Sequence, residues 1–447
     1  MRSETKVYTY PNGEIQRVQL VRLDDWTELE FLRPTYDPAA FEGFCRVYRE
    51  YLVPACPWIF GNMVLFHIPD DLEVNFPYVS KKYGEVADRI TAAAIALRTG
   101  VKIIGGKPVF RNGQVRNFWH ALEKRKSVQI VSGKLPVTTI IPVGSGAGFL
   151  SETEPDARMK VNGSFFIMDR FDCATVYDQI GTPLGLLVKD GMVENPPLFR
   201  REALLIKKDG SVSVGVPDLC EMEIEINGKR YIYGKNAAVY SRPDRARTPR
   251  SKGTKLVIIG CRVAAVSDRG SVLIPASGFV LCPEGECTAA PGDQVIYHGL
   301  EDVQFGIQVG NSIIKNGEKT DRFLSRFYNI RALERIPFPP SLYPLDFDRS
   351  RAARIALGVD AEGKPVILWA EGAGKLHYSS GTDSCGATLA DMARICSELG
   401  VVNGVNLDGG GSAQILLKNK RSLMISDRDP EDNSECQRAV PIGLVVR

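Results

Sequence analysis

The chain has 447 residues, of which 44% are hydrophobic, enough for two or three buried cores. Its 56 Lys and Arg residues nearly balance its 53 Asp and Glu residues, so the net charge of +3 gives no sign of a nucleic-acid groove or a polybasic membrane surface. No apolar run reaches the length of a membrane span, and the opening MRSETKVYTYPNGEIQ lacks the apolar core of a secretory signal. We therefore expect a cytoplasmic protein, with export by another route left open.

The ten cysteines are scattered along the chain and form no CxxC pair. Their spacing therefore supports neither a zinc ribbon nor a thioredoxin-type site. We expect reduced and mostly buried thiols. The alternative is a single disulfide between Cys282 and Cys287, which lie close together in CPEGEC.

The first 150 residues mix helical and strand patterns. Residues 40–55 predict a short amphipathic helix that Pro54 closes, and residues 82–100 predict a longer helix that ends at Gly100. No motif in this part carries chemistry that can be assigned. We expect a smaller α/β region over residues 1–150, followed by a second unit over residues 151–447.

Beyond residue 151, short apolar stretches recur with Gly, Asn and Asp between them. Several contain an Asp-Gly or Asn-Gly pair where alternating strands would turn back, as in LLVKDGMV, EIEINGKRY and SIIKNGEK. Such pairs favour the tight turns of β-hairpins. This region is therefore predicted to be rich in strands.

One strong helix pattern follows, in residues 385–400, CGATLADMARICSELG. Thr388 and Asp391 form a capping-box pattern at its start, and Gly400 suits its end. Strand patterns lie before it, in PVILWAEG, and after it, in GVNLD and AQILL. The fold class predicted for residues 151–447 is α+β, with a strand-rich mixed sheet and helices packed on it.

The stretch NLDGGGSAQILL carries the strongest chemical signal. Strand alternation sends Val405 and Leu407 to one face, and Asn406 and Asp408 to the other. Three glycines then follow, whose backbone N–H groups can form a nest for an anion, and Ser412 adds a hydroxyl donor. The alternative is a glycine-rich hairpin turn with a solvated aspartate. A single Asp-Gly pair would suffice for that, so we favour the anion site.

The order of motifs over residues 155–447 resembles the phosphodiester glycosidase family. NLDGGGS is intact, and the family's NGGFF element is present as NGSFF from Asn162, with Ser164 in place of the second glycine. The element RIALG begins at Arg354, with Ile355 where Thr or Ser is usual. VILWAEG supplies Glu371, and the closing strand QRAVPIGLVV supplies Arg438.

This resemblance implies a hydrolase that cleaves the bond between the anomeric carbon of a sugar and a phosphodiester. Such a site needs an anion cradle, cationic donors and a carboxylate that activates water or stabilises an oxocarbenium-like transition state. The catalytic candidates are Asp408 and, second, Glu371. The substrate-binding candidates are Asn162, Gly163, Arg354, Asn406, Gly409, Gly410, Gly411, Ser412 and Arg438. We expect Asn162, Arg354, Glu371 and Asp408 to lie together.

Other roles remain open for several of these residues. Glu371 can be a solvated strand-end carboxylate, Arg438 a structural ion-pair partner, and Asn162 a turn-stabilising side chain. The alternative function is a non-catalytic carbohydrate- or phosphate-binding protein on the same scaffold. Asp427, Asp429 and Glu431 alternate as in a calcium loop, but the glycine of such a loop is missing. We expect no metal and no cofactor, a glycan or small-molecule phosphodiester as the partner, and no nucleic acid.

Overall fold

The computed structural model describes residues 1–34, 147–167, 181–198, 201–242, 247–268, 270–320, 351–372, 378–428 and 434–447, with shorter pieces at 57–60, 63–68, 101–104, 107–110, 112–113, 116–117, 128–132, 175, 177–178 and 245. The helices predicted at residues 40–55 and 82–100 lie outside these residues.

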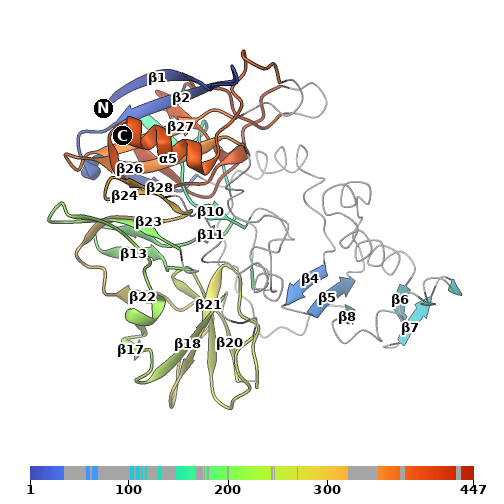
Figure 1. Ribbon diagram of the computed structural model, residues 1–447. Helices are drawn as coiled ribbons and strands as arrows, with labels where there is room; N and C mark the ends of the chain where they lie inside the picture. The colour runs from blue at the N-terminus through green and yellow to red at the C-terminus, as the bar shows by residue number, and fades with distance from the viewer. Residues whose placement is uncertain are drawn as a thin grey trace.

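A seven-stranded sheet forms the part of the molecule drawn at the top of Figure 1. Its strands run in the order β1 (Arg2–Thr9), β2 (Ile15–Arg22), β27 (Pro365–Ala370), β26 (Arg354–Asp360), β28 (Val401–Asn406), β24 (Ser312–Lys315) and β25 (Glu318–Lys319). All the neighbours in this sheet pair antiparallel. Strands from both ends of the chain thus lie side by side.

Smaller sheets contain the other strands. The five-stranded sheet has the order β13 (Met192–Asn195), β12 (Leu187–Lys189), β23 (Val303–Gln308), β14 (Ala203–Lys207) and β15 (Val212–Gly215). Two four-stranded sheets contain β29 (Ile415–Leu417), β9 (Met159–Asn162), β30 (Gly443–Val446) and β3 (Glu30–Leu32), and β18 (Ala237–Ser241), β21 (Gly278–Pro283), β19 (Lys255–Ile259) and β20 (Arg262–Ser267).

The shortest assemblies complete the described elements. The three-stranded sheets are β17 (Lys229–Ile232), β16 (Glu223–Ile226) and β22 (Val295–His298), and β4 (Pro57–Phe60), β5 (Met63–Ile68) and β8 (Val128–Ser132). The two-stranded pairs are β10 (Phe165–Phe166) with β11 (Pro183–Leu184), and β6 (Val101–Ile104) with β7 (Lys107–Phe110). The short 3-10 helices are η1 (Trp26–Glu28), η2 (Leu219–Glu221) and η3 (Gly410–Ser412).

The predicted hairpins are confirmed. Asp190-Gly191 turns β12 into β13, Asn227-Gly228 turns β16 into β17, and Asn316-Gly317 turns β24 into β25. In each pair both residues have positive φ, as a type I′ turn requires, for example 53° at Asn227 and 75° at Gly228. Asn and Asp accept this left-handed conformation at lower cost than most residues, which explains their place before the glycine.

The predicted C-terminal helix is also confirmed, as α5 (Leu389–Glu398). Thr388 Oγ1 accepts from the Asp391 N–H at 3.0 Å, and the Thr388 N–H donates to Asp391 Oδ2 at 3.0 Å, which completes the capping box. Gly400 has a φ of 77° just beyond the end of the helix. Met392, Ala393 and other apolar residues of one face of α5 pack on the seven-stranded sheet.

Two apolar cores lie on the two faces of the seven-stranded sheet. Ile355, Leu357 and Val359 of β26 point into the larger core, which the five-stranded sheet and the sheet of β9 and β30 share. Ala356 points the other way, into the core under α5. Because both faces of the sheet are covered, the central strands are apolar on both sides rather than alternating.

The prediction of an α+β fold with several packed helices is wrong. Among the described elements whose bounds are given above, α5 is the one α-helix, and β5 with β8 is the one parallel pair of strands. The physical reason is the hairpin pattern: consecutive strands joined by two-residue turns pair antiparallel and need no crossover helix. Over the described residues the fold is built mainly of antiparallel sheets, and α5 packs on the seven-stranded one.

The first strands belong to the same sheets as the last ones. β2 pairs with β27, and β3 pairs with β30. Residues 2–32 are therefore joined by backbone hydrogen bonds to the C-terminal part of the chain. The boundary at residue 150 stays a prediction, and a separate N-terminal unit would have to begin after β3.

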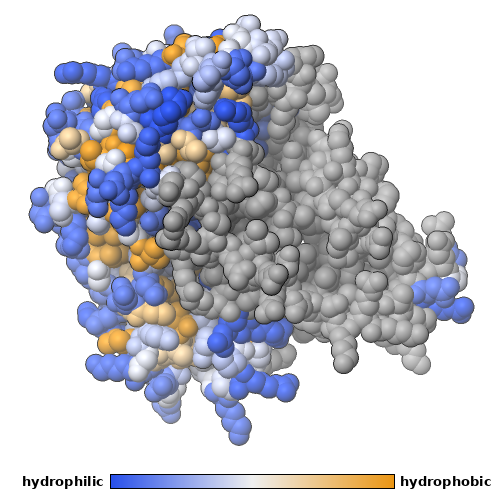
Figure 2. Space-filling model, in the orientation of Figure 1, coloured by the Kyte–Doolittle hydropathy of each residue, from blue (hydrophilic) through white to orange (hydrophobic). Residues whose placement is uncertain are grey.

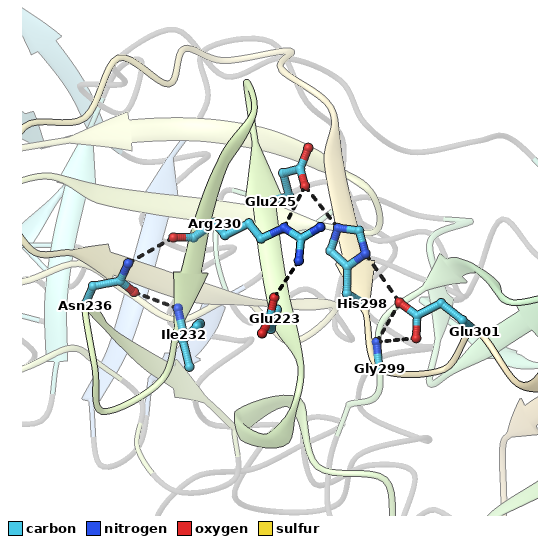
Figure 3. A network of polar contacts seen from close by, with 8 residues as sticks. All are labelled: Glu223, Glu225, Arg230, Ile232, Asn236, His298, Gly299 and Glu301. Atoms are coloured by element: carbon cyan, nitrogen blue, oxygen red, sulfur yellow. Dashed lines mark hydrogen bonds and ion pairs between the residues drawn. The ribbon is translucent and has the colours of Figure 1, made fainter.

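The outer three-stranded sheet carries the polar network of Figure 3. Arg230 of β17 forms ion pairs with Glu223 and Glu225 of β16, at 3.0 and 3.2 Å, and His298 Nε2 of β22 lies 3.1 Å from Glu225 Oε2. These side chains are partly or largely exposed, so water screens the pairs and they contribute little to stability. On the face shown in Figure 2, hydrophilic residues likewise cover much of the described surface.

The cysteines of the described residues are all free thiols, so the alternative of a disulfide between Cys282 and Cys287 is wrong. Burial raises the pKa of the Cys396 thiol in α5 to about 12, and that of Cys261 to about 11. Within the part of the chain that the structure describes, no helix is long and apolar enough to cross a membrane.

Replacing Thr388 by Ala should remove the bonds of its hydroxyl group with the Asp391 N–H and with Asp391 Oδ2, and leave the bond that the backbone N–H of residue 388 donates to Asp391 Oδ2. We expect the free energy of unfolding, measured in urea, to fall by about 1 kcal/mol. Thr388→Ser keeps the hydroxyl group and should lose far less. An equal loss in both variants would show that the hydroxyl does not cap the helix.

Candidate functional site

Three neighbouring strands in the middle of the seven-stranded sheet, β27, β26 and β28, start or finish at the same end of the sheet. We call this line of strand ends the sheet edge. Arg354 begins β26 and lies opposite Ala370, which ends β27. Ala356 lies opposite Asn406, which ends β28. Because these pairs are antiparallel, Arg354, Glu371 and Asp408 come to the same edge although they are far apart in the sequence.

Residues 407–414 cross from this sheet to the neighbouring four-stranded sheet, joining β28 to β29. The Leu407 N–H donates to the Ile355 carbonyl at 2.8 Å, on the seven-stranded side. The Asp408 N–H donates to the Gly163 carbonyl at 3.1 Å, on the side of β9. We call residues 408–412 the glycine loop. It is held by both sheets at its start.

Asn162 fastens both ends of this crossing. Its side-chain amide donates to the Asp408 carbonyl at 2.7 Å, and its side-chain oxygen accepts from the Gln414 N–H at 3.0 Å. The side chain is buried, with 1% exposed. The structure therefore gives Asn162 a supporting role beneath the loop, close to the alternative of a turn-stabilising asparagine. A role in contacting substrate stays a prediction.

A side chain is disfavoured at each of the three glycines, for a different reason at each position. A Cβ on Gly409 would lie 2.8 Å from the Ala353 carbonyl oxygen. Gly410 has a φ of 59°, in the left-handed region. A Cβ on Gly411 would overlap Asp427 Oδ2 and Arg438 Nη2. The triplet is thus required by the way the loop packs, which the sequence pattern did not reveal.

The amides of the loop are partly engaged inside the protein. The Gly410 N–H donates to the Ala353 carbonyl at 2.8 Å, and the Ser412 N–H donates to the Gly409 carbonyl at 3.2 Å within η3. Gly411 and Ser412 are buried, whereas residues 408–410 are partly exposed. An anion would therefore meet the start of the loop rather than its end.

Arg438 and Asp427 form an ion pair beside the loop. Arg438 Nε and Nη2 lie 3.0 and 2.9 Å from Asp427 Oδ2, and Arg438 Nη1 donates to Ser412 Oγ at 3.3 Å. The aspartate is buried, so the pair is screened little by water. The sequence around Asp427 resembles a calcium loop without its glycine, and a structural ion pair was the alternative for Arg438. The structure joins the two.

Arg354 and Asn406 are both buried at the sheet edge. Arg354 Nε donates to the Ala387 carbonyl at 3.2 Å, and the Arg354 side chain passes 3.6 Å from the place of a Cβ on Gly409. Asn406 packs against Gly310, whose missing Cβ leaves room for the asparagine amide. Asp408 itself is partly exposed.

The carboxylate of Glu371 is bonded to several groups of the protein. Its carboxylate pairs with Arg17 at 3.2 Å, accepts from the Met424 N–H at 2.8 Å, and accepts from the Ser384 hydroxyl. Only 2% of the residue is exposed. It borders a polar cavity of about 740 Å³, which Arg17, Thr382 and residues 419–424 also line. This bonding favours a positioning role over that of a carboxylate that attacks or activates water.

Several residues of the site were missed because nothing in their local sequence marks them. Arg17 lies at the start of β2, in the part of the chain outside the family resemblance, and Ser384 lies in the loop before α5. The Gln414 side chain donates to the Ser412 and Arg438 carbonyls, both at 3.4 Å. Its position two residues beyond NLDGGGS was the one available signal.

No group of three or more His, Cys, Asp and Glu side chains is placed to hold a metal ion within the described residues. Asp429 and Glu431 lie outside these residues. The expectation of no metal and no cofactor stays a prediction.

Replacing Gly411 by Ala should force apart the ion pair of Asp427 and Arg438. We expect the free energy of unfolding, measured in urea, to fall by about 3 kcal/mol, through overpacking and the loss of a buried pair. In the matched variant Gly410→Asn, the new Cβ meets nothing within 4 Å and asparagine tolerates the left-handed conformation. That variant should lose less than about 1 kcal/mol. Equal losses would contradict the steric role of Gly411.

Known proteins are similar to this chain in its C-terminal part. The family model described as phosphodiester glycosidase matches residues 262–447. The N-acetylglucosamine-1-phosphodiester alpha-N-acetylglucosaminidases of Mus musculus and Homo sapiens are both 35% identical over 95 residues, which are 21% of this chain and 17% of each of those proteins. The chain thus matches about a sixth of the length of these curated relatives.

Solved structures show weaker similarity. A hypothetical protein from Synechocystis has a TM-score of 0.41 and 16% identity, covering 100% of this chain and 62% of that one. The catalytic domain of the zebrafish N-acetylglucosamine-1-phosphodiester alpha-N-acetylglucosaminidase, auto-inhibited by its pro-peptide, has a TM-score of 0.35 and 12% identity, covering 100% and 82%. The family match contains α5, the glycine loop, Glu371 and Arg438. Residues 262–447 are thus similar to the phosphodiester glycosidase family, which the order of motifs in the sequence also resembles.

Proposed function

We propose that this protein hydrolyses the glycosidic bond of a sugar-1-phosphodiester and releases the free sugar. The main support is the place of Asp408: a partly exposed carboxylate at the start of the glycine loop, at the sheet edge where Arg354 also lies. This loop lies within the residues that match the family.

The chemistry of such a substrate suits a site of this kind. Water adds to the anomeric carbon, the bond from that carbon to the phosphate oxygen breaks, and the products are the free sugar and a phosphate monoester. Because a phosphate is a weak base and leaves readily, little general-acid help is needed. The remaining demands are a carboxylate near the anomeric carbon and positive charge or N–H donors near the phosphate.

We assign these roles to three parts of the site. Asp408 activates the water or stabilises the positive charge that develops on the sugar ring. The backbone N–H of Gly409, at the exposed start of the glycine loop, faces the phosphate. Arg354, which lies behind Gly409, adds positive charge there.

Glu371 and Arg438 act indirectly in this proposal. Both are held by internal partners: Glu371 by Arg17, Ser384 and Met424, and Arg438 by Asp427. The Glu371 carboxylate oxygens are taken up by protein donors, so they are not placed to reach a sugar or a water molecule. We therefore propose Asp408 alone as the catalytic carboxylate, and Glu371 as a residue that holds the sheet edge.

The substrate that we propose is an α-N-acetylglucosamine-1-phosphodiester or a close analogue, because the curated relatives carry that substrate in their names. The alternative is a protein that binds a carbohydrate or phosphate without cleaving it. One observation supports this alternative: Glu371 and Arg438 are paired with protein groups, which leaves fewer side chains to carry out cleavage.

The direct test is incubation of the protein with α-N-acetylglucosamine-1-phospho-methyl mannoside and other sugar-1-phosphodiesters in water labelled with ¹⁸O. We expect free sugar that carries the label at its anomeric oxygen. Asp408→Asn should lower kcat by at least about a hundredfold, as loss of a general base does, with an unchanged thermal midpoint. Label in the phosphate instead would mean that the P–O bond breaks.

Asp302→Asn is the matched control, because Asp302 pairs with Lys207 on the five-stranded sheet, away from the glycine loop. It should retain full activity. Absence of turnover on every diester, with binding retained, would favour the non-catalytic alternative.

A further inference from the structure

We propose that Asp427 is a positioning residue: through Arg438 it anchors the buried end of the glycine loop, and so fixes the exposed end as a phosphate-binding surface. This inference rests on the proposed function for the place where phosphate binds. Asp427 lies within residues 262–447 but outside NLDGGGS and the other motifs that carry the family resemblance.

The ion pair fixes the orientation of the guanidinium. Arg438 Nε and Nη2 both lie within 3.0 Å of Asp427 Oδ2, and 13% of the arginine side chain and 2% of the aspartate side chain are exposed. Charge-assisted hydrogen bonds in such a poorly solvated place are stronger than exposed ones. Arg438 therefore has little freedom to turn toward a ligand.

The third nitrogen of the guanidinium reaches the loop. Arg438 Nη1 donates to Ser412 Oγ at 3.3 Å, and Ser412 is fully buried in η3. Ser412 is thus placed as the anchor of the loop rather than as a ligand contact. Removing the carboxylate of Asp427 would take away the bonds that orient Arg438 Nε and Nη2, and would weaken this anchor.

The backbone around the pair is tied in the same way. The Cys436 N–H donates to the Asp427 carbonyl at 3.0 Å, and the Gln414 side chain donates to the carbonyls of Ser412 and Arg438. Ser426 Oγ, beside Asp427, donates to the Gly410 carbonyl at 3.4 Å. The segments that carry Asp427 and Arg438 therefore contact the glycine loop at both Gly410 and Ser412.

The glycine at position 411 is independent evidence for this contact. A side chain there would overlap both Asp427 Oδ2 and Arg438 Nη2, so the loop has no side chain where the ion pair passes. The pair and the loop are packed against each other without intervening atoms. A change in the pair must therefore change the shape of the loop.

The charge balance explains why Arg438 acts through the loop and not on the substrate. Asp427 neutralises the guanidinium and takes two of its nitrogens. The phosphate is then received at the exposed start of the loop, by the Gly409 N–H, with Arg354 behind it. The sites of anchoring and of binding are adjacent but distinct.

The test measures binding of inorganic phosphate by calorimetry, which needs no turnover. We expect Asp427→Asn and Ser412→Ala each to raise the Kd for phosphate about tenfold or more, the loss typical of a hydrogen bond to a charged group. The double variant should be no worse than the weaker-binding single variant, because both changes release the same anchor.

Asp360→Asn is the matched control, because it also removes a partly buried ion pair, the one with Arg22. Asp360 ends β26, so it lies at the end of the seven-stranded sheet opposite to Arg354 and the glycine loop. It should leave the Kd for phosphate unchanged. If Asp427→Asn does not fold, Ser412→Ala alone still decides, since it leaves the ion pair intact. Unchanged phosphate affinity in Ser412→Ala, additive effects in the double variant, or no phosphate binding by the wild type would overturn the inference.

The proposed function and this inference can fail separately. Phosphate binding that weakens in both variants, without hydrolysis of any diester by the wild type, would reject the catalytic function and keep the positioning role. Hydrolysis by the wild type, with a phosphate affinity that neither variant changes, would keep the catalytic function and reject the positioning role.

Discussion

The register of β26 is the constraint on which the site depends. Its antiparallel pairing with β27 on one side and β28 on the other brings the start of one strand and the ends of two others to the same edge. The strand is buried on both faces, so a shift by one residue would move Ile355 and Leu357 out of one core and Ala356 out of the other. The positions of Arg354, Glu371 and Asp408 are therefore fixed by the packing of two cores.

The features that the sequence predicted correctly are those that depend on neighbours in the chain. The Asn-Gly and Asp-Gly turns, the capping box of Thr388 and Asp391, and the common face of Val405 and Leu407 all follow from local rules. The α+β class was wrong because one clear helix pattern was extended to the whole region.

The parts of the site that could not be predicted depend on contacts between distant segments. Nothing near Glu371 in the sequence shows that Arg17 and Ser384 will surround its carboxylate. The glycine run was interpreted as a place for an anion, whereas two of its members have no side chain because Ala353 and the pair of Asp427 and Arg438 occupy that space. A pattern can indicate that a backbone comes close to something, but not what that something is.

The pairing of the first strands with the last ones has a consequence for how the chain reaches its native state. β2 needs β27, and β3 needs β30, so neither sheet can be completed during synthesis until almost the whole chain has left the ribosome. Contacts of such high sequence separation slow folding and leave strand edges unpaired in the meantime. β3 would wait longest for its partner, because β30 (Gly443–Val446) is made after β27 (Pro365–Ala370), so this strand keeps an unpaired edge until the last of the described strands is made.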